Sequence, residues 1–592
     1  MLERQPTPPT PIEPALRPSG FRRHWRPLAR GAGIAAAAVA IGLWPGPEAP
    51  YGLWFWLWLA GLVAYAASFQ PAGQSYPFPS PAVVLWLLGI VALAVALRLP
   101  RIADIPANIS IDELLPAMEA QHLVRGSPSN IVSSTGWFSM PNLSFAFPAL
   151  VMKVFGVSFY TQRLSSLLMG IGGIVATWLL ARRLFGDATA LISGFLMAVA
   201  FWHIHNSRTG FPFVQSSFFP ALVLYLLIRA RQDYSRAVLA VAGVTLGFAL
   251  QFYFPVRILL VMAPLFLVMD WIACRTPVRS VVAEAAIVAT GALLALGPLL
   301  MSVPLDVLIG HSVGVLLGRP AVLQGGEKFY HMQGLWMVFT RNLAESTAMF
   351  TSWADVCVLN RSPSGLLDSG TLAALVLGIL VALLQGGEYV WLMLIWAAFT
   401  FAVGVAFTDA PRASYRLAAA MPALFILAGL GIERVLMAAA PPSRWYRRTV
   451  RAAVLLALAV WVGWQNYHLF FVRYASGDGH ETVGGMEMRF MGDHCDGRMF
   501  YGFGSEPQGA ETQLFCTDLR TLNRGQMPSG VDVTRPATFF VNDWQHQWLT
   551  ILRTCYPAAE FTPHVAPDGR PLFTRVDVPI TELIARHPGC VG

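Results

Sequence analysis

The sequence carries little charge for its length. Of its 592 residues only 12% are charged, whereas soluble globular domains carry about 25%. Lysine is almost missing and occurs only as Lys153 and Lys328. The net charge of +8 comes from arginines in short segments between apolar runs, which is not the basic patch of a nucleic-acid-binding protein. The composition therefore excludes an ordinary soluble domain and indicates no nucleic-acid partner.

Sequence motifs for nucleotide-driven chemistry are also missing. The chain contains no P-loop, no G-x-G-x-x-G fingerprint and no Cys/His spacing typical of a zinc site. A nucleotide-driven pump is therefore not favoured.

Long apolar runs are what the sequence has instead. Hydrophobic residues make up 55% of the chain, and its mean hydropathy is +0.54. Each run is close to the roughly 20 residues that cross a bilayer as a helix, the structure that satisfies the backbone within one segment. We predict a polytopic α-helical membrane protein with about thirteen transmembrane helices. They are residues 31–46, 51–69, 82–99, 160–182, 187–203, 213–231, 237–253, 257–273, 281–302, 371–385, 389–407, 414–436 and 451–472.

Arginine placement predicts the membrane topology, because cytoplasmic loops are enriched in Arg and Lys. With the N-terminus in the cytoplasm, arginine-bearing connections such as Arg182-Arg183 fall on the cytoplasmic side. The segments 100–159, 303–370 and 473–592 then lie outside. Stretches such as Pro141–Phe155 are typical of interfacial helices. We expect a multi-pass protein of the bacterial inner membrane with its C-terminal domain in the periplasm.

The composition divides the chain into four parts. Residues 1–30 are basic and proline-rich and are predicted to form a disordered cytoplasmic tail, and residues 31–81 hold two helices ahead of the core in 82–472. The polar segment 473–592 predicts a small α/β domain. Its expected strands are Arg498–Phe503, Ala537–Val541 and Pro571–Val578, and its expected helix is Asp543–Cys555.

Four of the six cysteines lie in this last segment. They are Cys495, Cys516, Cys555 and Cys590. An even number in an extracytoplasmic domain predicts two disulfides with three alternative pairings, and buried free thiols are the alternative. Cys274 and Cys357 lie far apart in the predicted topology and are not expected to pair.

An acidic pair follows the third predicted span. Asp112 and Glu113 lie in the first large outer segment, where carboxylates close to a membrane are costly to desolvate without a role or a partner. The functional interpretation is a general base that removes a proton from an acceptor hydroxyl. The alternative is the first turn of a helix, where acidic residues are favoured in any case.

Cations at the outer ends of the spans are candidates for holding a phosphate. Arg208 is the last residue of the stretch Phe201–Arg208. The N–H groups of its planar guanidinium can donate to two oxygens of one phosphate group. His203 and His205 are two residues apart and do not share a helix face, so they do not indicate a metal pair. Further outer cations are Lys153, Arg163, Arg257, Arg412 and Arg416. The alternative is interfacial anchoring and snorkelling toward headgroups.

An ordered set of motifs resembles the GT-C membrane glycosyltransferases, in the group of protein O-mannosyltransferases and aminoarabinose transferases. The likeness runs over about residues 82–475. Its motifs are Ile111-Asp112-Glu113 with Pro141, Phe155-Gly156, Gln162–Leu167, Arg183–Gly186, Trp202-His203, Ser207-Arg208, Tyr253 to Arg257, Trp353 with Asp355, Asn360 and Pro363, Arg416 before Pro422, and Asn466-Tyr467. Two departures are Ser139-Met140-Pro141, where the aminoarabinose transferases have a lysine beside prolines, and the two additional N-terminal helices.

The resemblance implies inverting transfer of a sugar from a polyprenyl-phosphate donor to a hydroxyl on an acceptor protein, lipid or glycan. Asp112 would be the base and Glu113 its partner. The donor phosphate would meet Arg208, with Arg257, Arg416 and Arg163 as further cations. The substrate cavity would include His203, His205, Tyr253, Asp355 and Asn360. The biological roles that the resemblance implies are protein glycosylation and lipopolysaccharide modification. No cofactor is required, and a divalent metal bridging the phosphate is compatible with this chemistry.

Three alternatives remain open at this point. A transporter or lipid flippase would place ionisable residues near the bilayer midplane, whereas here the span interiors are almost free of charge, with Glu284 as the main exception. An O-antigen polymerase or ligase would lack the early acidic pair. A non-catalytic scaffold would act through its outer domain, and substitution of Asp112 separates it from an enzyme.

Overall fold

The computed structural model describes residues 20–585 with internal gaps. The gaps are 47–50, 72–75, 108, 110, 127–129, 315, 317–319, 332, 353–354, 356–361, 409–411, 439–443, 477–485, 488–489, 492–496, 504–518, 523–530, 543–545 and 566–570.

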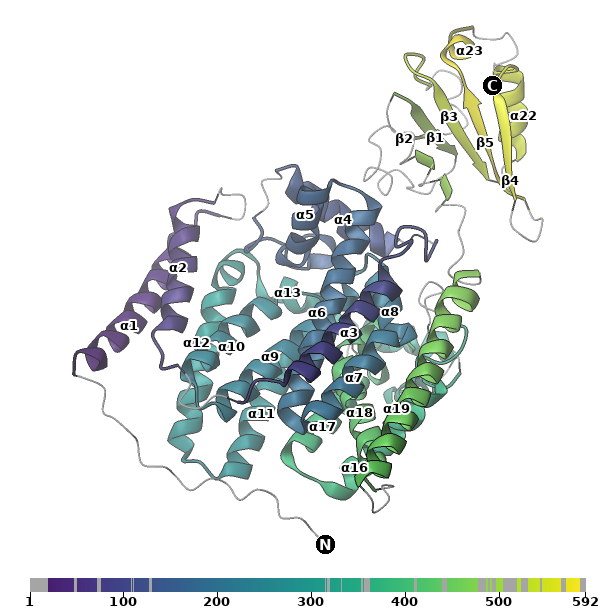
Figure 1. Ribbon diagram of the computed structural model, residues 1–592. Helices are drawn as coiled ribbons and strands as arrows, with labels where there is room; N and C mark the ends of the chain where they lie inside the picture. The colour runs from purple at the N-terminus through teal and green to yellow at the C-terminus, as the bar shows by residue number, and fades with distance from the viewer. Residues whose placement is uncertain are drawn as a thin grey trace.

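A body of packed helices makes up most of the molecule (Figure 1). Its long helices are α1 (Gly20–Gly42), α2 (Leu53–Ala67), α3 (Pro81–Arg98), α6 (Phe159–Phe185), α7 (Asp187–Val199), α8 (Phe201–Arg208), α9 (Gln215–Gln232), α10 (Arg236–Ala249), α11 (Leu259–Cys274), α12 (Val278–Ser302), α16 (Ser369–Gln385), α17 (Glu388–Phe401), α18 (Met421–Ala438) and α19 (Arg444–Tyr467). Between or beyond them lie short 3₁₀- or π-helical segments: η2 (Pro212–Val214), η3 (Phe254–Ile258), η5 (Ala402–Ala406), η6 (Ser414–Ala420) and η7 (His468–Tyr474).

Small residues let these helices pack closely. A Cβ atom added to Gly247 of α10 would lie 2.4 Å from the Ala292 carbonyl oxygen of α12, and one added to Gly378 of α16 would overlap the backbone of Leu427 in α18. Such contacts between backbones are typical of helix pairs in membranes, where packing rather than hydrophobic burial drives association.

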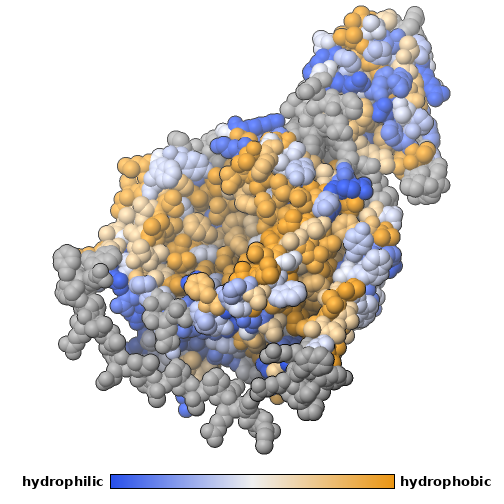
Figure 2. Space-filling model, viewed as in Figure 1, coloured by the Kyte–Doolittle hydropathy of each residue, from blue (hydrophilic) through white to orange (hydrophobic). Residues whose placement is uncertain are grey.

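The helical body has the surface of a membrane protein. In Figure 2 hydrophobic residues dominate its middle, and hydrophilic residues gather toward its ends and on the C-terminal domain. Within the described residues, eight helices are long and apolar enough to span a bilayer, or nine if the bent pair α7–α8 is one span. The expected class of polytopic α-helical membrane protein is confirmed. The total of thirteen spans, the side of each loop and the cellular membrane stay predictions.

One predicted span differs from the structure. The expected helix 187–203 is two helices, α7 and α8, which meet at Ala200 with a bend of 60°. Ala200 has an extended backbone, with φ −60° and ψ 129°, and the Asn466 side chain accepts the N–H of Phe201 at 2.7 Å. The break turns α8 aside, so that Arg208 reaches the end of α3.

Short helices cover one end of the body, which we call the outer end. They are α4 (Ile111–Val124), η1 (Trp137–Ser139), α5 (Leu143–Phe155), α13 (Leu305–Gly314), α14 (Pro320–Tyr330) and α15 (Leu335–Ala348). The expected helical stretch Pro141–Phe155 corresponds to α5. In Figure 1, α4 and α5 lie at the end of the body that also carries the C-terminal domain.

Arginines of the connections predicted to be cytoplasmic form ion pairs. Arg183 pairs with Asp233 at 2.6 Å, and Arg231 contacts both Asp270 at 2.5 Å and Glu284 at 2.8 Å. The one carboxylate noted inside a predicted span, Glu284, therefore has an arginine partner. These pairs tie the ends of α6, α9, α11 and α12 together.

The C-terminal domain is a five-stranded sheet in the order β2-β1-β3-β5-β4. Its strands are β1 (Met499–Phe503), β2 (Leu519–Leu522), β3 (Ala537–Asn542), β4 (Glu560–Val565) and β5 (Pro571–Val578), with helices α22 (His546–Cys555) and α23 (Ile580–Ala585). β1 pairs in parallel with β2 and β3, and β5 pairs antiparallel with β3 and β4. The expected α/β domain is confirmed, and β2 and β4 are strands that the sequence pattern did not predict.

The cysteines of this domain are described in part. Cys555 at the end of α22 is disulfide-bonded, and its residue is buried in the core formed by α22 and the sheet. Cys495, Cys516 and Cys590 lie outside the described residues. Cys274 is a free thiol at the end of α11.

Candidate active site

A cavity of about 600 Å³ lies beneath the helices of the outer end. Among the described residues, three charged ones line it: Asp112 from α4, Arg257 from η3 and Arg416 from η6. The rest of its wall is largely apolar or aromatic. Those residues are Trp137, Phe138, Phe213, Tyr253, Phe254, Pro255, Ile258, Leu260, Val261, Leu316, Phe399, Thr400, Val403, Gly404, Thr408 and Tyr415. An apolar pocket with a few converging charged groups is the usual form of a ligand site.

Asp112 is the carboxylate of the acidic pair that faces the cavity. It lies in the first turn of α4 and is half-buried. Burial raises the pKa of its carboxyl above the ordinary value of 3.8, because the low-dielectric surroundings disfavour the charged form. A raised pKa makes a carboxylate a better proton acceptor, which is what a general base requires.

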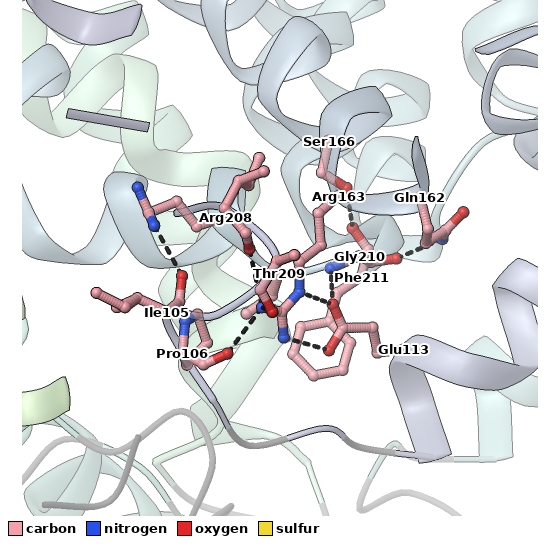
Figure 3. Close-up of polar contacts among 12 residues, drawn as sticks. Ile105, Pro106, Glu113, Gln162, Arg163, Ser166, Arg208, Thr209, Gly210 and Phe211 are labelled. Carbon is pink, nitrogen blue, oxygen red and sulfur yellow. Dashed lines mark hydrogen bonds and ion pairs between the residues drawn. The ribbon is translucent and has the colours of Figure 1, made fainter. Parts of the chain in front are cut away.

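Glu113 points the other way and is fully buried. Its carboxylate accepts two hydrogen bonds from Arg163 of α6, at 2.7 and 3.1 Å, and a third from the backbone N–H of Gly210 (Figure 3). A side chain at Gly210 would collide with Glu113 and Gln162. Glu113 is therefore a positioning residue that fixes α4 to α6, while its neighbour Asp112 is left facing the cavity.

Arg163 and Arg208 are also buried, and both bind backbone carbonyl groups. Arg208 donates all five of its hydrogen bonds to the carbonyl oxygens of residues 97, 98, 100, 101 and 105, at 2.8–3.0 Å. Arg163 donates to those of Ile102, Ala103 and Pro106, in addition to Glu113. Figure 3 shows the two guanidinium groups on the chain around Ile105 and Pro106.

This arrangement corrects the sequence-based assignment of Arg208 and Arg163 to the donor phosphate. The five N–H donors of an arginine are all occupied at Arg208, and neither residue lines the cavity. The carbonyls of residues 97 and 98 are among the last of α3, which have no partner inside their own helix. Arg208 is thus a cap of α3, and the two arginines hold the segment that leads to α4.

In the part of the chain that the structure describes, Arg257 and Arg416 are the arginines that reach the cavity. The Arg257 guanidinium lies 4.8 Å from the Phe254 ring and donates to the Leu308 carbonyl at 2.6 Å. Arg416 lies over Tyr415, with 5.6 Å between guanidinium and ring. Two guanidinium groups in an apolar cavity are suited to a phosphate, since charge-assisted hydrogen bonds are strongest away from water.

Asp355 does not line the cavity but supports Arg416. Its buried carboxylate accepts hydrogen bonds from the backbone N–H, at 2.8 Å, and the hydroxyl of Ser414. Ser414 begins η6, the turn that carries Tyr415 and Arg416 into the cavity wall. The predicted link of Asp355 to the site is therefore indirect.

Of the remaining residues predicted to line the cavity, Tyr253 does so and the two histidines do not. Tyr253 lines the cavity between Phe213 and Phe254. The two histidines lie elsewhere: His203 contacts Arg98 at 2.9 Å, and His205 contacts the Tyr474 hydroxyl at 3.0 Å. Their placement in the cavity was wrong, because the 60° bend turns α8 toward α3 and η7. Asn360 lies outside the described residues.

Sequence reasoning missed the aromatic wall. Trp137, Phe138, Phe213, Phe254 and Tyr415 line the cavity; none of them carries a charge, and of these five only Phe254 falls within one of the motifs. Aromatic residues recur throughout this chain as 12% of its residues, so their type alone gave no signal. Over the described residues, no group of three or more His, Cys, Asp or Glu side chains is arranged to hold a metal ion.

Comparisons with known proteins agree with the fold. A family model described as dolichyl-phosphate-mannose-protein mannosyltransferase matches residues 139–301. The apo crystal structure of ArnT from Cupriavidus metallidurans covers 85% of this chain and 99% of its own, with 15% identity and a TM-score of 0.52. The likeness to the apo crystal structure of the Archaeoglobus fulgidus oligosaccharyltransferase covers 87% of this chain and 78% of that chain, with 13% identity and a TM-score of 0.50.

A curated relative is an uncharacterised protein of Aquifex aeolicus (strain VF5), 38% identical over 87 residues. The match spans 14% of this chain and 17% of that protein. ArnT from Cupriavidus metallidurans has also been solved with undecaprenyl phosphate bound; that structure is similar over 83% of this chain and 97% of its own, with 16% identity and a TM-score of 0.45.

The chain therefore has the fold of the GT-C membrane glycosyltransferases. The family match, over residues 139–301, lies within the stretch whose motifs resemble the group of protein O-mannosyltransferases and aminoarabinose transferases.

Proposed function

We propose that this chain transfers a hexosyl or pentosyl group from a polyprenyl-phosphate donor to an acceptor hydroxyl, with inversion and with Asp112 as the general base. The observation that carries the proposal is the cavity itself, where one carboxylate and two arginines share an otherwise apolar and aromatic wall. The matched family model describes dolichyl-phosphate-mannose as donor and a protein as acceptor, which supports a lipid-phosphate donor here. We further propose the bacterial inner membrane as its location.

The two arginines would receive the donor phosphate. As the bond from the anomeric carbon to the phosphate oxygen breaks, negative charge grows on the departing polyprenyl phosphate. Fixed cations in a cavity shielded from water stabilise such charge strongly. Arg257 and Arg416 are placed for this role by η3 and η6.

The apolar wall would hold the first part of the lipid. Leu260 and Val261 of α11 and Phe399 of α17 line the cavity and belong to candidate membrane spans. A polyprenyl chain could follow these helices into the bilayer while its phosphate stays at the arginines. The acceptor would enter from the outer end.

Asp112 would remove the acceptor proton. The acceptor hydroxyl oxygen attacks the anomeric carbon on the face opposite the phosphate and loses its proton to the Asp112 carboxylate, while the phosphate leaves with the bonding electron pair. Base catalysis of this kind contributes roughly 10²- to 10⁴-fold to a rate. Glu113 is paired with Arg163 and would keep α4 in place rather than exchange protons.

The experiment is glycosyl transfer from radiolabelled polyprenyl-phosphate sugars in membranes, comparing wild type with Asp112→Asn at matched expression. We expect transfer in wild type and a loss of roughly 10²-fold or more in the variant. Asp187→Asn is the control, because Asp187 also lies in the first turn of a helix but away from the cavity. Equal transfer by wild type and Asp112→Asn would contradict the role of the base.

A further inference from the structure

A short β-hairpin-like loop of the first outer segment forms part of the cavity wall. Its two arms meet where the Asn142 N–H donates to the Ser134 carbonyl at 2.8 Å, and where Thr135 bridges Pro141. Its tip is the turn η1, from which Trp137 and Phe138 line the cavity with Asp112. We call residues 134–142 the tip loop.

The tip holds an unusual backbone conformation. Phe138 and Ser139 both lie in the left-handed region, with φ of 51° and 58°. Non-glycine residues rarely adopt it, because the Cβ atom crowds the backbone there. Such conformations persist where the surroundings fix them, and they are concentrated at functional sites. Phe138 is 54% exposed although it is large and apolar, and it lines the cavity beside Trp137.

The N-terminal helix pair holds the base of this loop. The Tyr51 hydroxyl, just before α2, accepts the Ile131 N–H at 2.9 Å. Val132 is buried in one hydrophobic cluster with Trp54 and Trp58 of α2. The Trp58 indole in turn donates to the Leu294 carbonyl of α12 at 2.8 Å, which fixes α2 to the helical body.

The helix that carries Asp112 contacts the other side of the same loop. An added Cβ at Gly136 would lie 2.7–2.9 Å from the carboxylate atoms of Glu119, so the glycine backbone packs directly on this α4 side chain. The aromatic tip is therefore held at a fixed position relative to the base, by α4 on one side and by α2 on the other.

We propose that Trp137 and Phe138 receive the sugar ring of the donor, and that α2 sets their position through Tyr51 and Val132. The proposal rests on the function proposed above, in which the phosphate lies at Arg257 and Arg416 and the reacting carbon near Asp112. The sugar must then lie between them, beside the aromatic tip. The C–H face of a sugar ring is apolar, and aromatic rings are the side chains that pack best on a flat apolar face. The helix pair α1–α2 thereby becomes a positioning element of the site.

The test separates the sugar from the lipid phosphate. Binding of polyprenyl phosphate without a sugar is measured for purified full-length protein, together with the KM values for the sugar donor and for the acceptor. The variants are Trp137→Ala, Phe138→Ala and Phe138→Tyr for the tip, and Tyr51→Phe for its anchor. Tyr76→Phe is the matched control, since the Tyr76 hydroxyl donates to the Arg182 carbonyl away from the tip loop.

We expect Trp137→Ala and Phe138→Ala to raise the KM for the donor roughly 3- to 10-fold, the loss of one aromatic contact. Tyr51→Phe should raise it by a smaller factor, and Phe138→Tyr should keep it near the wild-type value. Binding of the sugarless polyprenyl phosphate should be unchanged in all of them, which also shows that the variants are folded.

Three results would overturn the inference. One is an unchanged donor KM in Trp137→Ala and Phe138→Ala. Another is a rise in the acceptor KM alone, which would make the tip an acceptor contact. The third is an equal loss of sugarless polyprenyl phosphate binding, which would make the tip part of the lipid-phosphate site. If the wild-type chain binds no polyprenyl phosphate at all, the proposed donor is wrong and the inference fails with it.

Discussion

The guanidinium of Arg163 donates two hydrogen bonds to the carboxylate of Glu113, and both side chains are almost completely shielded from solvent. This pair gives the two members of the acidic pair different surroundings. Glu113 is neutralised inside the protein, and Asp112 faces the cavity with Arg257 and Arg416. Adjacent residues of the same helical turn thus have different roles because their side chains leave the helix in different directions.

Breaking this buried pair should destabilise the protein. Glu113→Gln leaves the Arg163 charge buried without its counter-ion, and such losses cost about 3–5 kcal/mol. Thermal unfolding in detergent should show a clear fall in midpoint. Arg341→Ala is the control, since its pair with Glu345 is half-exposed and worth about 0–1 kcal/mol. A Glu113→Gln protein as stable as wild type would refute the structural role.

Arg208→Lys should also destabilise the protein rather than weaken donor binding selectively. A lysine has three donors in place of five and lacks the planar fork, so carbonyls between residues 97 and 105 would lose their partners. We expect faster proteolysis around this segment and a lower unfolding midpoint. A normal midpoint together with a raised donor KM would restore Arg208 as a phosphate ligand.

The cavity arginines should determine affinity for the lipid phosphate. Arg257→Ala and Arg416→Ala each remove one charge-assisted contact worth about 1.5–3 kcal/mol, or roughly 10- to 100-fold in affinity. Binding of sugarless polyprenyl phosphate measures this directly. Arg275→Ala, an exposed arginine at the end of α11, should bind like wild type. Binding unchanged in both cavity variants would move the phosphate site elsewhere.

The pH dependence of transfer should report Asp112. Because burial raises the pKa of this carboxyl, it takes up a proton at a pH above its ordinary value of 3.8. The protonated form cannot accept the acceptor proton, so kcat/KM should fall as the pH drops through the raised pKa. The residual activity of Asp112→Asn should lack this acidic limb. An identical limb in both proteins would assign it to another group.

Much of the architecture could be predicted from the sequence. Apolar runs of near-membrane length predict helices, because a helix satisfies the backbone within one segment in lipid. Short strand-like runs in the polar C-terminal segment gave the strands around Met499–Phe503, Ala537–Asn542 and Pro571–Val578. The acidic pair was likewise visible as a local motif.

The roles of the individual charged residues were decided by the tertiary structure. Arg208, Arg257 and Arg416 have the same chemistry in the sequence. Arg208 donates its hydrogen bonds to backbone carbonyls of a distant segment, whereas Arg257 and Arg416 line the cavity. At the bend next to Ala200 the Phe201 N–H donates to Asn466, which lies 266 residues further along the chain than Ala200. Composition and spacing determine which segments enter the membrane, because that depends on each segment alone. Which side chain faces the cavity depends on partners brought together only by folding.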